Sequence, residues 1–182
     1  MARPHWPEQI LTRARPVTLL ALDVDGVMTD GSLLFSAAGD ELKAFNILDG
    51  LGLKQAMAAG IQVAVITGRN SPLTERRMTS LGIDTLLQGR EDKLTALREI
   101  VSARGLSPAQ VAYMGDDLPD LAAIRYAGLG ATVPNGHWYV RQHADYCTRV
   151  AGGAGAVREL TDLLLGARGV LDTELQRWQG DC

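Results

Sequence analysis

A short apolar run that stops at a cluster of acids restricts the fold of this chain more than any other segment. The run is Leu19–Leu22, and Asp23, Asp25 and Asp30 follow it. Short apolar runs bounded by turn residues are typical of strands buried on both faces of a parallel sheet. In open α/β sheets, ligands bind in the crevice beyond the carboxyl ends of the strands. Acids this close together repel one another, so we expect a hard cation such as Mg²⁺ among them, where it could also hold a phosphate.

Polar residues also follow two other apolar segments. Strands are predicted at 61–66 and Val111–Met114, and they lead directly into Thr67-Gly68-Arg69 and Gly115-Asp116-Asp117. A predicted helix carries Lys93 in its first turn, on the side where the strands end. Because parallel strands end at a common edge of the sheet, we expect these side chains to gather at one site.

Strands that alternate with helices indicate an α/β fold with a doubly wound, Rossmann-like parallel sheet. A β-hairpin predicted at 32–46, around a Gly-Asp turn, interrupts this alternation. We expect the 182 residues to form a single domain with its core at about 17–165. The N-terminal extension 1–16, with a helix at 7–13, is predicted to be a surface appendage, and the tail 167–182 to be poorly ordered. The other predicted elements are helices at 51–59, 72–82, 91–104, 137–142 and 156–165, a helix ending near 126, and strands at Thr85–Leu87 and Leu129–Thr132.

Composition narrows the class of partner. The formal net charge is −3, and a pI near 5.6 argues against nucleic acid as the main partner. No apolar run is long enough to span a membrane, and the N-terminus lacks the continuous apolar region of a secretory signal. We therefore expect a soluble, cytoplasmic protein that acts on a small molecule.

The residues expected at the strand ends are those that phosphoryl transfer requires. Asp23 and Asp25 supply a carboxylate nucleophile and an acid or base, Thr67 a hydroxyl, and Lys93 a cation. Each of these features alone is common in loops and caps of no catalytic role. Their joint appearance after successive strands favours a phosphoryl-transfer enzyme.

The order and spacing of these motifs resemble a known superfamily. Asp23-Val24-Asp25-Gly26-Val27, Thr67-Gly68, Lys93 and Gly115-Asp116-Asp117 with Asp120 are similar to the four motifs of the haloacid dehalogenase superfamily. Over about 17–165, further segments are similar to the family of 3-deoxy-D-manno-octulosonate 8-phosphate phosphatases. These segments are Thr29-Asp30-Gly31, 42–46, Asp49-Gly50 and 155–159.

The resemblance implies a haloacid dehalogenase-type fold with no large cap domain, since neither segment between the motifs has room for one. It also implies a phosphoric monoester hydrolase that releases a sugar acid needed for lipopolysaccharide biosynthesis. Asp23 would attack phosphorus and become an aspartyl-phosphate, while Asp25 would protonate the leaving alcohol and then deprotonate water. Thr67 and the Gly68 amide would bind phosphoryl oxygens, and Lys93 would neutralise negative charge.

A metal site follows from the same combination of chemistry and resemblance. Asp23, Asp116 and the backbone carbonyl of Asp25 would hold Mg²⁺ together with waters and phosphate. Asp117 and Asp120 would orient these ligands and Lys93. An alternative for Asp120 is a helix-terminus carboxylate with no role in catalysis.

Substrate recognition is expected from a loop and three cations. The substrate carries a phosphate and a carboxylate, so cations should attract it. Some family members have Arg at the positions of Leu48 and Ala154, and the absence of these two cations weakens the inference about which acid sugar is bound. The residues that the resemblance implies in substrate contact are Asn46, Ile47, Leu48, Asp49, Gly50, Lys54, Arg69 and Arg77.

Three other functions remain open on sequence grounds. The protein could be a capless phosphatase for a nine-carbon acid-sugar phosphate, a signalling receiver domain, or a non-catalytic regulatory domain of the same fold. Asp25, two residues after the nucleophile, argues against a receiver domain, and the intact acid set argues against loss of catalysis.

A capless site lacks a cover, and the hairpin 32–46 is the projecting segment that could supply one. The apolar residues Leu33, Leu34, Phe35, Leu42 and Phe45 give it more apolar surface than a free hairpin should expose. We expect hairpins to pair between subunits, and the resemblance implies a homotetramer in which each hairpin covers a neighbouring active site. The alternative is a hairpin folded back onto its own sheet.

Overall fold

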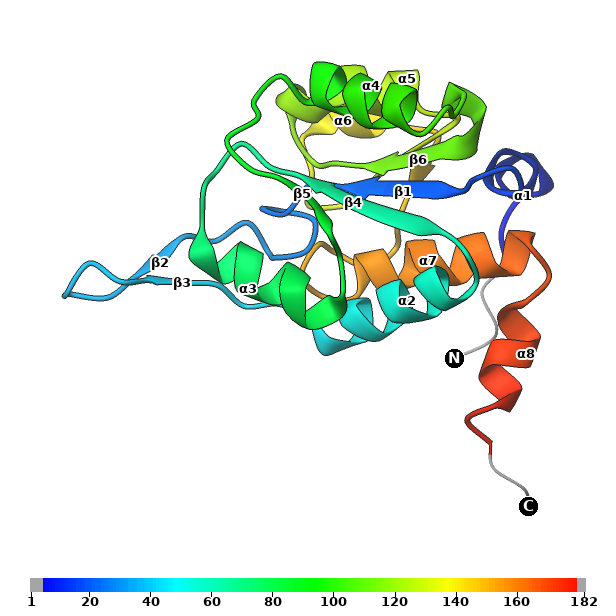
Figure 1. Ribbon diagram of the computed structural model, residues 1–182, viewed down its shortest axis with the longest axis horizontal. Helices are drawn as coiled ribbons and strands as arrows, with labels where there is room; N and C mark the ends of the chain where they lie inside the picture. The colour runs from blue at the N-terminus through cyan, green and yellow to red at the C-terminus, as the bar shows by residue number, and fades with distance from the viewer. Residues whose placement is uncertain (1–4, 180–182) are drawn as a thin grey trace.

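The computed structural model describes residues 5–179, and a six-stranded parallel sheet forms its centre (Figure 1). The strand order is β5-β4-β1-β6-β7-β8, and every neighbouring pair is parallel. The predicted doubly wound α/β fold is therefore confirmed. The strands are β1 (Leu19–Leu22), β4 (Gln62–Ile66), β5 (Thr85–Leu87), β6 (Val111–Met114), β7 (Leu129–Thr132) and β8 (Tyr146–Cys147).

Helices cover both faces of the sheet (Figure 1). Side chains of β1 alternate between two hydrophobic clusters, because Leu20 and Leu22 point to one face and Leu19 and Ala21 to the other. This explains why the run is apolar throughout. One face carries α2 (Ile47–Ala58), α3 (Pro72–Leu81) and α7 (Ala156–Ala167), and the opposite face carries α4 (Lys93–Ala103), α5 (Leu121–Tyr126) and α6 (Trp138–His143).

Strand order places β1 at the topological switch point of the sheet. Its residues pair with β4 on one side and with β6 on the other, with Leu22 beside both Val65 and Met114. The segments that follow β1, β4 and β6 therefore emerge next to one another. In sheets of this type, the crevice at the switch point is where ligands bind.

The predicted hairpin forms a two-stranded sheet of its own and projects from the body (Figure 1). It comprises β2 (Leu34–Phe35) and β3 (Glu41–Leu42), in antiparallel pairing. Gly39 turns the chain with a φ of 89°, a conformation that other residues rarely adopt. The segment between β1 and α2 thus contains this hairpin and no cap domain.

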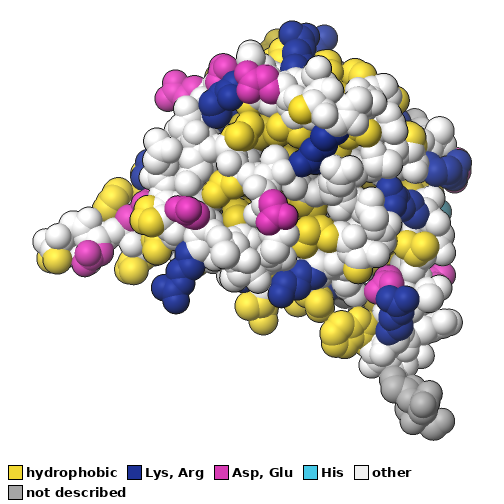
Figure 2. Space-filling view, in the orientation of Figure 1, with side chains coloured by type: hydrophobic (Ala, Val, Ile, Leu, Met, Phe, Trp, Pro, Cys, Tyr) yellow, Lys and Arg dark blue, Asp and Glu magenta, His cyan; other side chains and the backbone are white. Residues whose placement is uncertain are grey.

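The hairpin exposes most of the apolar side chains predicted on it, as the yellow patches on the projecting segment in Figure 2 show. Leu33, Leu34, Phe35 and Leu42 are between 47% and 62% exposed. Phe45 differs from the prediction because it lies partly buried against the main hydrophobic cluster.

Both ends of the described chain pack onto the body, which corrects two predictions. Trp6 precedes helix α1 (Glu8–Ala14) and Ile10 lies within it, and both are buried in the main hydrophobic cluster. Trp6 lies against α7 at Gly166, where an added Cβ would come within 2.9 Å of its ring. Leu171 of helix α8 (Leu171–Gln176) is also buried. The N-terminal extension is therefore not a surface appendage and the tail is helical, although 1–4 and 180–182 lie outside the described residues.

Helix α2 begins earlier than the predicted start at 51. The side chain of Asn46 accepts a hydrogen bond from the Leu48 amide at 2.8 Å, which caps the helix and lets it start at Ile47. Asp49 and Gly50 thus belong to the first turns of a helix rather than to a loop. None of the helices within 5–179 has the length and apolarity that a membrane span requires.

Candidate active site

The end of β1 and the first turn of α4 bring a buried aspartate and a buried lysine together. Asp23 follows β1, is 5% exposed, and its amide donates to the Met114 carbonyl at 2.9 Å. Lys93, in the first turn of α4, places its Nζ 2.9 Å from Asp23 Oδ1 and 2.7 Å from Asp120 Oδ1. Burial alone would lower the pKa of Lys93, but Asp120 and Asp23 outweigh it and raise that pKa. Lys93 therefore stays an ammonium between two carboxylates.

Asp120 organises the site and is itself fully hydrogen-bonded. Its Oδ1 accepts from Lys93 and from the hydroxyl of Tyr113, each at 2.7 Å. Its Oδ2 accepts from the amides of Asp116 and Asp117 at 3.2 and 3.3 Å. These bonds fix the loop after β6 and the ammonium of Lys93. Sequence reasoning missed Tyr113, whose only signal was a hydroxyl in an otherwise aliphatic strand.

The carboxylates form a cluster that repels itself. Asp23, Asp116 and Asp120 each offer an oxygen within 4.8 Å of the others. Burial, and then the charge of Asp120, raise the pKa of Asp23 from 3.8 to about 7, although Lys93 acts in the opposite direction. Burial and Asp120 likewise raise the pKa of Asp116 to about 6. An all-oxygen set of this kind fits Mg²⁺. Since Asp120 is already saturated with hydrogen bonds, Asp23 and Asp116 are the side chains able to hold the ion.

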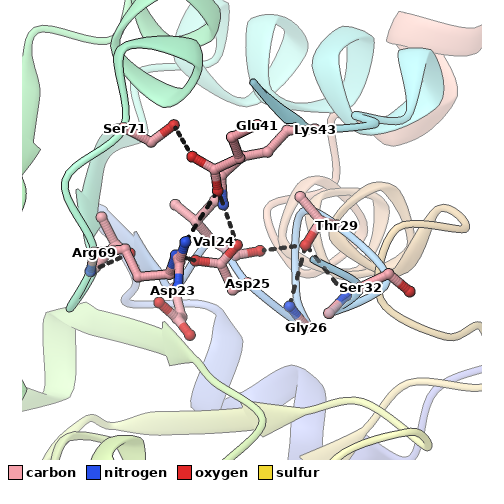
Figure 3. Close-up of polar contacts among 12 residues, drawn as sticks. Asp23, Val24, Asp25, Gly26, Thr29, Ser32, Glu41, Lys43, Arg69 and Ser71 are labelled. Carbon is pink, nitrogen blue, oxygen red and sulfur yellow. Dashed lines mark hydrogen bonds and ion pairs between the residues drawn. The ribbon is translucent and has the colours of Figure 1, made fainter. Parts of the chain in front are cut away.

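Gly26 allows the loop after β1 to lie directly against Asp116. A Cβ at Gly26 would come within 2.0 Å of Asp116 Oδ2, and its φ is 91°. Thr29 Oγ1 accepts from the Gly26 amide at 3.3 Å (Figure 3), and Asn135 donates to the Gly26 carbonyl at 3.2 Å. The backbone next to Asp25 is thereby fixed close to the acid cluster. Asn135, 109 residues away in sequence, was not predicted as part of this site.

Thr67 lies at the end of β4, beside the end of β1. It is 2% exposed, and its amide donates to the Leu87 carbonyl at 2.9 Å. Gly68 and Arg69 follow, and the amide of Arg69 lies 3.4 Å from Thr67 Oγ1. The turn therefore presents a hydroxyl and backbone amides at the same edge of the sheet as Asp23.

The hairpin contributes two charged residues that sequence reasoning missed. Lys43 donates a hydrogen bond to Asp25 Oδ1, and Arg69 Nε lies 3.9 Å from Asp25 Oδ2 (Figure 3). Glu41 accepts from Arg69 at 3.1 Å and from the Ser71 hydroxyl at 3.4 Å (Figure 3). Residues two apart in a strand share a face, so the positions of Glu41 and Lys43 in the hairpin strand were the available signal. Ser71 directly precedes α3, and its hydroxyl donates to Glu41 rather than capping the helix.

Asp49 was predicted to contact the substrate, but the structure buries its side chain inside the fold. This side chain is 2% exposed, and its Oδ1 accepts from the Arg158 amide in the first turn of α7 at 2.8 Å. Burial raises its pKa to about 6. The prediction treated Asp49 as a loop residue, whereas its place in α2 turns it toward α7 and away from solvent.

Arg77 and Asn46 are likewise engaged in contacts within the fold. Arg77 donates to the Asn46 carbonyl at 3.2 Å, and its guanidinium lies 5.9 Å from the centre of the Phe45 ring. An added Cβ at Gly50 would come within 2.4 Å of Arg77, so Gly50 makes room for it. Asn46 also donates to the Gly153 carbonyl at 3.2 Å. These contacts hold the base of the hairpin against α2 and α3.

The remaining predicted substrate residues are exposed. Ile47 is 80% exposed and Leu48 is 51% exposed. Lys54 is exposed on α2, two turns beyond the start of the helix. The structure does not bring these three side chains into the cluster around Asp23.

Comparisons with known proteins agree with this geometry. Residues 86–160 match the family model of haloacid dehalogenase-like hydrolases. The chain is 46% identical over 163 residues to the 3-deoxy-D-manno-octulosonate 8-phosphate phosphatase of Escherichia coli K12, which covers 90% of this chain and 87% of that protein. It is also 46% identical over 169 residues to the Salmonella typhimurium enzyme of the same name, with 93% and 88% covered.

Solved structures show the same similarity. A 3-deoxy-D-manno-octulosonate 8-phosphate phosphatase from Moraxella catarrhalis, in complex with magnesium ion, phosphate ion and KDO, matches with a TM-score of 0.92 and 44% identity. The match covers 94% of this chain and 98% of that one. A cobalt-bound phosphatase for the same substrate from Haemophilus influenzae matches with a TM-score of 0.85 and 39% identity, over 88% of this chain and 94% of that one.

Proposed function

The chain belongs to the haloacid dehalogenase-like hydrolases, in the family of 3-deoxy-D-manno-octulosonate 8-phosphate phosphatases, and from this premise we propose its reaction. It hydrolyses 3-deoxy-D-manno-octulosonate 8-phosphate to the free sugar acid and phosphate, as a step of lipopolysaccharide biosynthesis. The observation that carries the proposal is the ion pair of Asp23 with Lys93 at the end of β1, with Asp25 two residues later.

Asp23 acts as the nucleophile. One of its oxygens attacks phosphorus while the bond from phosphorus to the ester oxygen breaks, which leaves an aspartyl-phosphate. Asp25 gives its proton to the departing ester oxygen, and the sugar acid leaves as an alcohol. Asp25 then takes a proton from water, which attacks phosphorus and releases phosphate. Asp23 is regenerated as a carboxylate.

Lys93, Thr67 and Gly68 stabilise the phosphoryl group. The ammonium of Lys93, fixed by Asp120, neutralises charge that develops on the phosphoryl oxygens. The hydroxyl of Thr67 and the amide of Gly68 donate to the same oxygens. These donors are held by β4 and α4 before substrate arrives, so little reorganisation accompanies the reaction.

Mg²⁺ would be held by Asp23 and Asp116, with the backbone carbonyl of Asp25 as a third protein ligand. The raised pKa values of both side chains support this assignment, because the one ammonium of Lys93 does not compensate three clustered carboxylates. When bound, the ion would offset the charge of the phosphate and orient it for attack. Asp117 and Asp120 act by fixing the loop that carries Asp116.

Arg69 is the residue best placed to meet the carboxylate of the sugar acid. Its side chain is 43% exposed and its Nε lies 3.9 Å from Asp25 Oδ2, where a bidentate contact to a carboxylate would position the substrate. Lys54, Ile47 and Leu48 stay predictions for substrate contact, whereas Asn46, Gly50 and Arg77 are proposed to support the site through the hairpin base. A homotetramer and a cytoplasmic location are part of the same proposal.

A panel of sugar-acid phosphates assayed with Mg²⁺ tests this function. We expect the highest kcat/KM for 3-deoxy-D-manno-octulosonate 8-phosphate, as measured by phosphate release. A nine-carbon acid-sugar phosphate as the best substrate would favour the alternative phosphatase. No phosphate release from any member would favour a regulatory domain and contradict the proposal.

A further inference from the structure

Lys43 is a buried ammonium whose main partner is the catalytic acid. Its side chain is 2% exposed, and it donates a hydrogen bond to Asp25 Oδ1 (Figure 3). The second carboxylate near it is that of Glu41, at 3.8 Å. A buried charge without a partner is costly. The ion pair therefore keeps the side chains of Lys43 and Asp25 together. Lys43 has no part in the reaction as proposed above.

The two oxygens of Asp25 have different surroundings. Lys43 occupies Oδ1, while Oδ2 has no hydrogen-bond partner among residues 5–179 and lies 3.9 Å from Arg69 Nε. The Asp25 side chain is 22% exposed, against 2% for Lys43. Lys43 thus fixes Oδ1 and leaves Oδ2 as the oxygen that the described residues do not hold by a hydrogen bond.

The contact joins two separate elements of the fold. Asp25 sits on the loop after β1, which Thr29 and Asn135 hold in place. Lys43 follows β3 on the projecting hairpin, and Glu41 on the same strand is held by Arg69 and Ser71. The inward face of the hairpin is therefore fixed against the end of β4, and this fixes the ammonium that faces Asp25.

We propose that Lys43 is a positioning residue for Asp25, and that it orients Oδ2 as the oxygen that exchanges the proton with the leaving group and then with water. This inference rests on the proposed phosphatase function. Lys43 does not touch substrate or the reacting atoms. Without it, the carboxylate of Asp25 is free to rotate about its side-chain torsions and to pair with Arg69.

The proposal predicts a dependence on the leaving group. A sugar alkoxide is a poor leaving group and needs the proton from Asp25, whereas p-nitrophenolate leaves without one. General acid–base catalysis contributes roughly 10²- to 10⁴-fold to a rate. Loss of the position of Asp25 therefore slows the first step, formation of the aspartyl-phosphate, far more for the sugar-acid phosphate than for p-nitrophenyl phosphate. The second step, in which water attacks the aspartyl-phosphate, needs Asp25 for both substrates and slows equally for both.

The test compares Lys43→Met, Lys43→Arg and the unchanged protein on both substrates with saturating Mg²⁺. For Lys43→Met we expect the rate of alcohol release from the sugar-acid phosphate in a single turnover, which reports the first step alone, to fall by roughly 30- to 100-fold, a part of the acid–base contribution. For release of p-nitrophenolate in a single turnover we expect a fall of less than about 3-fold. Lys43→Arg keeps a charged donor and should recover part of the loss. Arg76→Met removes a cation from the exposed face of α3 and serves as the matched control.

A double-mutant cycle with Asp25→Asn separates positioning from a structural role. If Lys43 acts through Asp25, Lys43→Met should lower kcat little further in the Asp25→Asn background. Equal losses in the single-turnover rate on both substrates, or additive losses in the cycle, would overturn the inference while leaving the phosphatase function intact. If the unchanged protein hydrolyses neither substrate, that result contradicts the proposed function, and this inference with it. If Lys43→Met does not fold, the comparison is made with Lys43→Arg. That variant must then lose more of its single-turnover rate on the sugar-acid phosphate than on p-nitrophenyl phosphate.

Discussion

At the scale of single residues, the site is dominated by negative charge that the protein does not neutralise. Asp23, Asp116 and Asp120 share the single ammonium of Lys93. The imbalance shows in the pKa of Asp23, which burial raises to about 7 in spite of Lys93. A phosphate dianion adds further repulsion. The charges of these residues therefore favour a bound divalent cation, independently of the resemblance to other proteins.

The nucleophile provides the most direct test of the mechanism. Asp23→Asn keeps the shape of the side chain and removes the attacking charge, so we expect kcat to fall by roughly 10⁴-fold or more. Folding should be retained, because the variant removes a charge from a crowded, buried cluster. Phosphate release and thermal unfolding measure the two effects. Substantial residual turnover in a preparation free of the unchanged protein would contradict the covalent mechanism.

The raised pKa values also make metal binding dependent on pH. Protons compete with Mg²⁺ for Asp23 and Asp116, whose pKa values are about 7 and about 6. We expect the Mg²⁺ concentration for half-maximal activity to rise as pH falls from about 7.5 to about 5.5. Titrations of activity with Mg²⁺ at several pH values measure this. A Mg²⁺ requirement that is constant over this range would contradict the assignment of Asp23 and Asp116 as ligands.

The same shifts determine how stability depends on pH. A carboxyl group whose pKa rises from 3.8 to about 7 on folding takes up protons on folding. Its contribution to stability is full below pH 3.8 and is lost as pH rises through about 7. For the metal-free protein, Asp23 and Asp116 should therefore lower Tm as pH rises from about 4 to about 7, and Mg²⁺ should reverse this. Asp116→Asn is the control, because it should reduce both the fall in Tm and the effect of Mg²⁺.

Residues at strand ends could be predicted from the sequence, whereas their supporting partners could not. Asp23 and Thr67 follow an apolar run directly and Asp116 follows one after Gly115, so one pattern locates all three. Lys43 and Asn135 reach the loop after β1 from segments that lie 18 and 109 residues away along the chain. Such contacts depend on how the hairpin and the loops fold back over the sheet, and a local pattern indicates at most which residues share a face, as for Glu41 and Lys43.

At the scale of helices and strands, many elements were predicted closely, whereas the packing of the chain ends was not. The strands Val111–Met114 and Leu129–Thr132 have the predicted bounds because apolar runs between turn residues mark them. The helix predicted at 7–13 lies at Glu8–Ala14, but no local pattern indicates that Trp6, Ile10 and Ala14 are buried in the core. Their burial depends on the surface of α7, which is formed more than 140 residues later in the chain.

Trp6 should therefore contribute strongly to stability. It is 7% exposed and packs on Gly166, so Trp6→Ala should lower the free energy of unfolding by about 3–5 kcal/mol. KM should not change, because Trp6 lies far from the strand ends that carry the site. Chemical denaturation and steady-state kinetics test both statements. Trp178→Ala is the matched control, as Trp178 is 67% exposed and its removal should have little effect.

At the scale of the whole molecule, the hairpin has two faces with different tasks. Glu41 and Lys43 point inward to Arg69 and Asp25. On the outward side, Leu34 and Leu42 pair across the strands and are 51% and 56% exposed. An apolar pair held in water by a two-stranded ribbon favours association with another protein surface. Most soluble oligomers are symmetric assemblies of identical chains, so we expect this surface to be that of a second copy of this chain.

Charging the outward pair tests whether the hairpin assembles the protein. Leu34→Glu with Leu42→Lys places opposite charges across the strand pair, which keeps the hairpin paired while making its outward face polar. We expect the unchanged protein to be a tetramer and the double variant to be a monomer with a folded core. Light scattering coupled to size-exclusion chromatography measures both. Leu175→Glu, on α8, introduces a charge at another exposed leucine and serves as the control.

Activity should change along with assembly, and in a way that differs from loss of Lys43. A monomer lacks the neighbour's hairpin over its site, so KM for the sugar-acid phosphate should rise while the small p-nitrophenyl phosphate is hydrolysed almost as before. Lys43→Met should instead lower kcat with KM nearly constant, because it disturbs the acid rather than the cover. An unchanged protein that is monomeric and fully active at assay concentration would contradict the shared site. In that case each hairpin would serve only its own subunit, through the contact of Lys43 with Asp25.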